Sequence, residues 1–298
     1  MTVGFIGFGE AGFTIGNSLR LAGAGPIVAF DINRDDPTRG SLIQRRAGDS
    51  QTALVDSSAD LARQARIIFS AVTSNAALDA ARQTAPFLGS DHIYADLNSV
   101  SPAVKREVAA VIAASGARFV EAAVMAPVGA YGHRVPMLLG GPSASAFVAA
   151  MAPFGMKLDV LDGAAIGSAA AVKMCRSIIV KGLEALMCEC VLAAGTFESD
   201  RYVFESLDES FPGMDWKKLA DYMVGRVVVH GERRAREMEE VAETLRAIDI
   251  DPIMAEATVR RQQWAADLRL RERFGSEGPR TYREVLEVLA CGFESTRR

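Results

Sequence analysis

The sequence predicts a doubly wound α/β domain with a mostly parallel sheet, followed by an all-α C-terminal domain. From Thr2 to about Leu161, short β-branched runs alternate with alanine-rich helical stretches, which is typical of βαβ units. Strand signals end after Gly163, where long helical patterns begin. The chain has 298 residues, a length that suits about two domains. We therefore expect domains at residues 1–162 and 163–298.

The strands of the first domain are expected where short apolar runs end in turn residues. They lie at residues 3–6, 27–30, 67–72, 93–96, 118–124 and 137–139. Apolar residues at helical spacing predict the intervening helices at residues 11–22, 76–87 and 102–114. Ser101 followed by Pro102 is a typical helix start, because the first helical position needs no N–H partner.

The second domain is expected to open with one long helix over residues 164–194, which tolerates its internal glycines. Pro212 and Pro252, each in a turn-like context, break the pattern that follows. Further helices are therefore expected near residues 200–210, 215–229, 231–247 and 253–271.

Composition limits the classes of function. Hydrophobic residues make up 49% of the chain and charged residues 23%, which is ordinary for a globular protein and excludes disorder over most of its length. The net charge of −4 gives no general affinity for nucleic acid. No apolar run reaches the roughly 20 residues of a membrane span. The 4 cysteines lack metal-ligand spacing, so we expect no metal site and a reduced, cytoplasmic protein.

A glycine-rich turn follows the first expected strand. The pattern G-x-G-x-x-G, placed between a strand and an apolar helix, consists of Gly7, Phe8, Gly9, Glu10, Ala11 and Gly12. In that context the first glycine permits a tight turn, the second lets a pyrophosphate approach the backbone, and the third lets the helix pack close to the sheet. The helix N-terminus then faces the phosphates. The motif predicts a dinucleotide site, and a glycine-rich turn that binds nothing is the alternative.

An acidic residue follows at the spacing that such sites require. Asp31 ends the second expected strand, about 20 residues after Gly12, where a carboxylate accepts hydrogen bonds from the ribose hydroxyls of NAD. Asn33 and Arg34 come next, and an arginine there is able to pair with the 2′-phosphate of NADP. We expect NAD as the cofactor and leave NADP open. The alternative for Arg34 is a solvated loop residue.

The order of motifs resembles the β-hydroxyacid dehydrogenase family, the relatives of 6-phosphogluconate and 3-hydroxyisobutyrate dehydrogenases. The resemblance rests on the glycine-rich turn, on the segment Asp96-Leu97-Asn98-Ser99-Val100-Ser101-Pro102, and on Lys173 in the long helix. It spans most of the chain, and the second half looks like a bacterial subgroup of phosphogluconate-dehydrogenase-like proteins of unassigned function. The resemblance implies a Rossmann domain, an all-helical C-terminal domain and an active-site cleft between them.

In such enzymes a strand-end segment with the pattern D-x-S-T-x-x-P lies near the nicotinamide. Here Asn98 replaces the first serine and Ser99 follows, and both side chains are able to hydrogen-bond a carboxamide or a substrate hydroxyl. The resemblance also assigns Val72 and Thr73 to the cofactor site. A helix cap before Pro102 is a compatible alternative for the Asn-Ser pair.

The family's substrate-binding segment, D-A-P-V-S-G-G, corresponds to residues 121–127. Met125 stands where the family has serine, and Pro127 lacks a backbone N–H, so a substrate carboxylate has to be held differently. The next loop supplies His133 and Arg134, of which Arg134 suits an anionic substrate. A solvated loop is the alternative.

The family pattern G-x-x-x-x-x-K-x-x-N-N corresponds to residues 167–177 of the long helix. Lys173 keeps the lysine, whereas Arg176 and Ser177 stand where the asparagines are expected. The resemblance makes Lys173 the general acid and base, with Ser177 and Asn98 orienting the substrate oxygen and Arg176 in the substrate pocket. A lysine that extends to solvent from an ordinary helix is the alternative.

A family helix reaches the active site in the region of His230, which is therefore a candidate substrate ligand. The alternative is a solvated helix face, because Glu232 with Arg236 and Arg233 with Glu237 have the spacing of i,i+4 ion pairs.

These features predict an NAD(P)-dependent oxidoreductase that transfers hydride between nicotinamide and a small, anionic 3-hydroxy acid or sugar acid. Decarboxylation is open if the product is a 3-keto acid. The altered motifs leave two alternatives, an imine reductase-like enzyme and a redox sensor that binds NAD(P) without turnover. No nucleic-acid or membrane partner is expected. The family's helical domains commonly pair, so a homodimer is expected.

Overall fold

The computed structural model describes residues 1–295, and the chain divides after Lys173 into two compact units. Helix α8 (Ser168–Thr196) begins in the first unit and continues into the second. Residue 162, the boundary proposed from the sequence, lies between the last strand and α8.

Within the described residues, eight strands form one sheet in the order β3-β2-β1-β4-β5-β6-β7-β8. Neighbours are parallel except β6 and β7, which are antiparallel. Because the order reverses between β1 and β4, the sheet has the topological switch point at which doubly wound folds bind ligands. The strands are β1 (Val3–Ile6), β2 (Ile27–Phe30), β3 (Ala53–Leu54), β4 (Ile67–Ser70), β5 (Ile93–Asp96), β6 (Arg118–Val124), β7 (Met137–Gly140) and β8 (Leu158–Val160).

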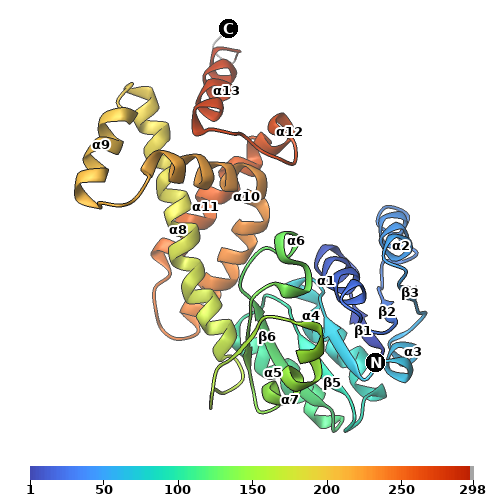
Figure 1. Ribbon diagram of the computed structural model, residues 1–298. Coiled ribbons are helices and arrows are strands. Elements are labelled where there is room, and N and C mark those ends of the chain that lie inside the picture. The colour runs from blue at the N-terminus through green and yellow to red at the C-terminus, as the bar shows by residue number, and fades with distance from the viewer. Residues whose placement is uncertain (296–298) are drawn as a thin grey trace. The chain divides into compact units, whose positions relative to one another are not determined.

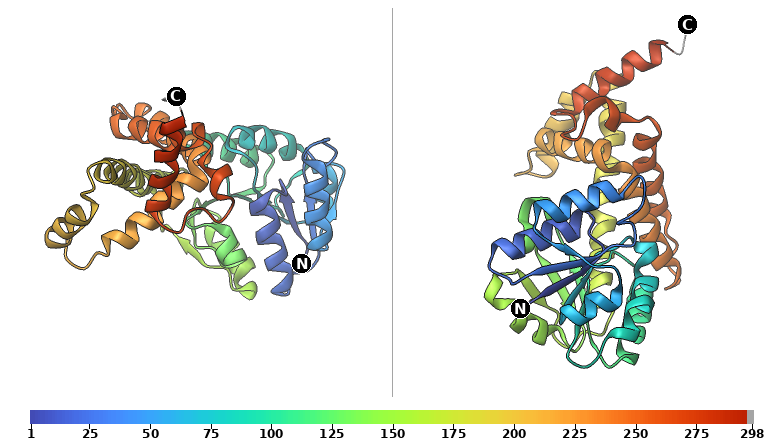
Figure 2. Two further views of the ribbon diagram at one scale, coloured as in Figure 1. Left: turned by 90° about the horizontal axis from the view of Figure 1, so that it is seen from above. Right: turned by 90° about the vertical axis from the view of Figure 1, so that its right-hand side faces the viewer.

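Helices cover both faces of this sheet (Figures 1 and 2). Successive strand residues point to opposite faces, so Phe5 and Phe69 belong to one core cluster, whereas Ile6 and Ile68 belong to the other. The first cluster is covered by α1 (Glu10–Leu21), α2 (Gly40–Asp49) and α7 (Ala144–Met151). The second is covered by α3 (Ser58–Gln64), α4 (Ala77–Thr84) and α5 (Pro102–Ala114). The predicted doubly wound α/β class is confirmed.

Among the described residues of the second unit, every regular element is a helix. Besides α8, its helices are α9 (Asp200–Ser210), α10 (Trp216–Arg246), α11 (Ile253–Asp267), α12 (Leu270–Phe274) and α13 (Tyr282–Ser295). Helices α10 and α11 pack along one another, and a Cβ on Gly231 would lie 2.5 Å from the carbonyl oxygen of Gln262. Among the described residues, no helix is both long and apolar enough for a membrane crossing.

Some element boundaries differ from the predictions. Residues 215–229 and 231–247 were expected to form two helices, but α10 is continuous, because Gly231 serves the close approach of α11 and does not break the helix. The expected start of α8 at residue 164 is wrong, since Gly167 has a φ of +100° and cannot be helical. The helix expected to reach residue 271 ends at Asp267, because Arg269 adopts a φ of +50°. Strands β3 and β8 have no counterpart among the expected strands.

Candidate active site

The glycine-rich turn joins β1 to α1 at the carboxyl end of the strand. Gly7 has a φ of +82°, and a Cβ on it would lie 2.6 Å from the carbonyl oxygen of Ala71. A Cβ on Gly12 would lie 2.3 Å from the carbonyl oxygen of Gly7, so α1 approaches the turn more closely than a side chain allows. At Gly9 a Cβ would meet no atom within 4 Å. Gly7 and Gly12 therefore build the turn, and Gly9 leaves open space beside it.

The start of α1 offers groups that suit a phosphate. The helix begins at Glu10, directly after Gly9, and no side chain caps its first N–H groups. Such N–H groups lack helical partners and carry the positive end of the helix dipole. Phe8 is fully buried, and Ala11 is half-buried in the first turn of α1. The open space at Gly9 and the uncapped helix end fit the pyrophosphate of a dinucleotide.

Asp31 follows β2, and two backbone N–H groups fix its carboxylate. One oxygen accepts a hydrogen bond from the Phe8 N–H at 2.7 Å, and the other accepts one from the Asn33 N–H at 2.9 Å. The Gly7 N–H donates to the carbonyl oxygen of Phe30 at 2.9 Å, which ties the turn to β2. The carboxylate thus has a fixed place beside the turn, where ribose hydroxyls are bound in sites of this kind.

Asn98 joins the carboxyl ends of β4 and β5. Its amide oxygen accepts a hydrogen bond from the Val72 N–H at 2.7 Å, and its amide nitrogen donates to Ser70 Oγ at 2.9 Å. Both ends of the amide are therefore used within the protein. Ser99 is half-buried and Thr73 is exposed at the neighbouring positions, so these hydroxyls lie where a ligand at the switch point would reach them.

A buried ion pair supports the same strand end. Lys105 Nζ lies 3.0 Å from one Asp96 carboxylate oxygen, and the two side chains are 1% and 0% exposed. The other Asp96 oxygen accepts a hydrogen bond from the Asn98 N–H at 3.0 Å. Removing either partner would leave a buried charge uncompensated, so the pair fixes the backbone that carries Asn98. From the sequence, Lys105 has no feature that separates it from an ordinary helix residue.

The loop between β6 and β7 contains the short helix α6 (Val128–Tyr131) and three predicted substrate ligands. Met125 is half-buried, and its N–H donates a hydrogen bond to the carbonyl oxygen of Pro136 at 2.9 Å. His133 is buried, with Nδ1 2.5 Å from Ser18 Oγ and Nε2 2.9 Å from the carbonyl oxygen of Phe154. Burial lowers its pKa below the usual value. These contacts explain the burial of His133 by a structural role. Arg134 is exposed, and its charge suits an anion.

Glu121 of β6 holds the start of α8, a role that the sequence did not indicate. The fully buried carboxylate accepts hydrogen bonds from the Gly167 N–H at 2.7 Å and from the Ala170 N–H at 2.6 Å. A Cβ on Gly140 would lie 2.8 Å from a Glu121 carboxylate oxygen, so glycine at 140 makes room for this acid. A negative charge is also favourable at a helix N-terminus. Glu121 thereby fixes the first turns of the helix that carries Lys173.

Beyond Lys173, α8 carries polar residues into the second unit. Lys181 Nζ lies 3.1 Å from Ser177 Oγ and 2.9 Å from a Glu237 carboxylate oxygen. Burial lowers the pKa of Lys181, and Glu237 acts in the opposite direction. One turn further on, the buried Glu184 and Arg234 form an ion pair at 2.5 Å. Ser177 therefore contacts the lysine of one of the two ion pairs that join α8 to α10.

His230 on α10 lies in a strongly basic environment. Burial and the surrounding positive charges lower its pKa to about 4, so the imidazole is neutral at neutral pH. The i,i+4 ion pairs expected for a solvated helix face are also present on this helix. Arg236 lies 2.5 Å from Glu232, and Arg233 pairs with Glu237. The charges that act on His230 come from Arg226, Arg233, Arg234 and Arg271.

The predicted residues fall into two groups by unit. The first unit brings the glycine-rich turn, Asp31 and Asn98 to the carboxyl ends of neighbouring strands, and it also holds Lys173. The second unit carries the exposed Arg176 and the half-buried Ser177 and His230. The part of the chain that the structure describes holds no group of three or more His, Cys, Asp or Glu residues suited to a metal.

Known proteins share this architecture. A family model described as the NAD binding domain of 6-phosphogluconate dehydrogenase matches residues 2–152, about half of the chain. The chain belongs to the β-hydroxyacid dehydrogenase family. Membership and the geometry of the turn agree on NAD(P) as the cofactor. In the second unit, a domain of unknown function, DUF1932, matches residues 198–265.

Relatives include proteins without an assigned activity. A conserved hypothetical protein from Sinorhizobium meliloti 1021 is 34% identical, with a TM-score of 0.79 over 97% of this chain and 96% of that chain. The conserved protein MTH1747, of unknown function and described as structurally similar to 3-hydroxyacid dehydrogenases, is 30% identical, with a TM-score of 0.73 over 91% and 98% of the two chains. The mitochondrial 3-hydroxyisobutyrate dehydrogenase of Drosophila melanogaster is 26% identical over 72% of this chain and 64% of its own length.

This member of the β-hydroxyacid dehydrogenase family departs from the family pattern around the substrate. Asn98, Met125, Arg176 and Ser177 stand where the family pattern has serine or asparagine. The glycines of the turn have the G-x-G-x-x-G spacing, and Gly7 has a φ of +82°. Met125, Arg176 and Ser177 are among the residues expected at the substrate, and Asn98 lies in the segment expected near the nicotinamide.

Proposed function

We propose that the protein is an NAD-dependent oxidoreductase acting on a small, anionic 3-hydroxy acid or sugar acid. The observation that carries the proposal is the dinucleotide cradle, in which open space at Gly9 lies beside a carboxylate, Asp31, held by two N–H groups. Lys173 on α8 is proposed to supply the group for proton transfer.

In the proposed reaction, Lys173 takes the hydroxyl proton of the substrate during oxidation and returns it during reduction. A bound nicotinamide supplies the carbon that accepts or donates the hydride. Ser177 is proposed to orient the substrate oxygen. Asn98 is proposed to act by shaping the ends of β4 and β5, because its amide is already used by Val72 and Ser70.

Positive charge near the proposed substrate residues favours an anion. Arg134 and Arg176 are exposed, and burial together with several nearby arginines lowers the pKa of His230 to about 4. Positively charged side chains attract anionic ligands. Arg134 of the first unit, and Arg176 and His230 of the second, are therefore each proposed as contacts for a carboxylate or phosphate group of the substrate.

The test is a screen of short-chain 3-hydroxy acids and sugar acids with NAD, followed through the absorbance of reduced nicotinamide, with chromatography of the products. Accumulation of a 3-keto acid supports the proposal, and release of carbon dioxide identifies oxidative decarboxylation. Turnover of cyclic imines alone would favour an imine reductase. Tight NADH binding without turnover of any hydroxy acid or imine would favour a redox sensor.

Asp31→Asn is expected to weaken NADH binding by about tenfold, because the charge-assisted hydrogen bonds to the ribose hydroxyls are lost. The measurement is a fluorescence titration of the full chain. Asp159→Asn serves as the matched control, since Asp159 is exposed on β8 at the far edge of the sheet. Equal affinities in Asp31→Asn and in the wild type would remove Asp31 from the cofactor site.

We also propose a cytoplasmic homodimer that pairs through α8. A stripe of exposed aliphatic side chains runs along this helix, and Cys175 and Cys188 are free, as in a reducing compartment. An exposed apolar face of this kind is typical of a protein–protein contact. The stripe consists of Val172, Ile179, Leu183 and Leu186, which are 42%, 64%, 44% and 56% exposed.

Ile179→Glu is expected to convert the dimer to a monomer, because it places a charge in the apolar contact. Light scattering after size-exclusion chromatography measures the mass. Ile253→Glu is the matched control, since Ile253 is equally exposed at 64% but begins α11. A monomeric wild type, or an Ile179→Glu variant that stays dimeric, would contradict the proposed interface.

A further inference from the structure

Arg34 lies in the loop after β2, three residues beyond the ribose-binding candidate Asp31. Its backbone is held by α2. Gln44 Nε2 donates a hydrogen bond to the Arg34 carbonyl oxygen at 3.1 Å. A Cβ on Gly40 would lie 2.4 Å from the same oxygen, so the helix start presses against this loop. These contacts hold the Arg34 backbone in place, so the position of the guanidinium depends on the conformation of the side chain.

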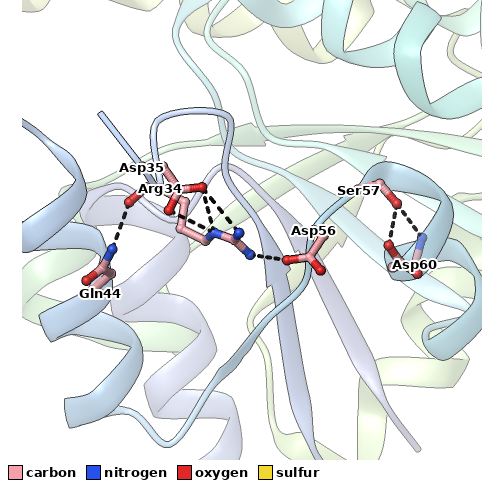
Figure 3. Close-up of polar contacts among 6 residues, drawn as sticks. All are labelled: Arg34, Asp35, Gln44, Asp56, Ser57 and Asp60. Atoms are coloured by element: carbon pink, nitrogen blue, oxygen red, sulfur yellow. Dashed lines mark hydrogen bonds and ion pairs between the residues drawn. The ribbon is translucent and has the colours of Figure 1, made fainter. Parts of the chain in front are cut away.

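Two carboxylates hold that guanidinium. Arg34 Nη1 lies 2.5 Å from an Asp56 oxygen, and Nη2 lies 3.2 Å from an Asp35 oxygen (Figure 3). The Arg34 side chain is 27% exposed, whereas Asp56 and Asp35 are 82% and 76% exposed. The arginine is thus more enclosed than either partner. Asp56 is the partner that comes from a separate segment of the chain.

The segment around Asp56 is anchored on both sides. Before it, the Val55 N–H donates to the carbonyl oxygen of Ala29 in β2 at 2.9 Å. After it, Ser57 is the N-cap of α3, and its Oγ accepts a hydrogen bond from the Asp60 N–H at 3.1 Å (Figure 3). Asp56 therefore projects from a fixed turn, and its ion pair with Arg34 has a defined geometry.

The contacts of Arg34 bear on the difference between the two nicotinamide dinucleotides. NADP differs from NAD by a phosphate on the adenosine ribose, and a free guanidinium binds phosphate through paired hydrogen bonds. Here that guanidinium is occupied by Asp35 and Asp56, and Asp31 adds a third carboxylate nearby in the chain. A phosphate would have to displace Asp56 and enter a region with excess negative charge.

We propose that Asp56 is a specificity-determining residue that makes the site select a dinucleotide with a free 2′-hydroxyl over one with a 2′-phosphate, by keeping Arg34 bound. This inference rests on the proposed use of NAD and on the cradle described above. It assigns discrimination to two residues together, Asp56 and Arg34.

The test is a set of fluorescence titrations with NADH and with NADPH. The full-length wild type is expected to bind NADH more tightly than NADPH. Asp56→Asn releases one of the two carboxylates from Arg34, so its Kd for NADPH is expected to fall by about fivefold to tenfold, as one net hydrogen bond from the guanidinium to the phosphate supplies. Its Kd for NADH is expected to stay within about twofold, since the ribose hydroxyls carry no charge.

Two comparisons isolate the mechanism. If the gain runs through Arg34, adding Asp56→Asn to an Arg34→Ala background is expected to leave the Kd for NADPH unchanged. Asp91→Asn is the matched control, because Asp91 is an exposed aspartate 2.5 Å from Arg66, in the loop before β5 at the opposite end of the strands.

Each outcome decides a different claim. An unchanged Kd for NADPH in Asp56→Asn would overturn the inference, and so would a gain that persists in the Arg34→Ala background. Tighter binding of NADPH by the wild type would also overturn it. If the wild type binds neither dinucleotide, the proposed function itself fails, whereas NADH binding without an Asp56 effect leaves that function intact.

Discussion

Lys173→Ala is expected to lower kcat by at least about 100-fold, the effect of removing a general acid and base. Lys173 is the residue of α8 that we propose as the proton-transfer group. Cofactor affinity is expected to stay nearly unchanged, because the cradle is built by the glycine-rich turn and Asp31. The measurement pairs steady-state kinetics on the substrate found in the screen with an NADH titration.

Lys157→Ala is the control for this experiment. Lys157 is exposed and lies before β8 in the first unit, so the substitution removes the same charge outside the proposed site. Full turnover in Lys173→Ala would reject the lysine as the proton-transfer group. A parallel loss of NADH affinity would show instead that the substitution disturbs the cradle.

Glu121→Ala is expected to lower the free energy of unfolding by about 3 kcal/mol, because two N–H groups lose a charged acceptor in a buried place. The affected groups are Gly167 and Ala170, at the start of α8. Hydrogen exchange at these amides is expected to accelerate, and kcat is expected to fall because Lys173 lies on the same helix. The Kd for NADH is expected to remain close to that of the wild type.

Two further variants sharpen the Glu121 experiment. Glu121→Gln keeps the volume and one acceptor oxygen, so its effects are expected to fall between those of the wild type and the alanine variant. Glu107→Ala on α5 is the control, since Glu107 is exposed. Unchanged exchange at the start of α8 in Glu121→Ala would contradict its role in positioning the helix.

Much of the fold follows from short-range patterns. Buried parallel strands show as continuous apolar runs, and the runs at β1, β2 and β5 end where the structure ends them. Strand β3 has only Ala53 and Leu54, which is too short for any periodic pattern. The continuity of α10 depends on the contact of Gly231 with α11, which no local pattern reveals.

The candidate site also contains residues that local sequence patterns predict and residues that they do not. The turn and Asp31 have a fixed order and spacing because backbone geometry demands glycine there, so their positions were predictable. Glu121 and Lys105 act through residues distant in the sequence, and each has the appearance of an ordinary charged residue. Their burial and partners emerge only from the assembled sheet. The pairing of Arg34 with Asp56 likewise joins two loops.

The most direct test of the central claim, that this chain binds and uses NAD, is a fluorescence titration of the purified full-length wild type with NADH and, separately, with NADPH. We predict saturable binding of NADH, tighter than that of NADPH, because Asp31 is the proposed ribose ligand and Asp56 pairs with Arg34. Absence of binding to either dinucleotide would contradict both the dehydrogenase and the sensor interpretations.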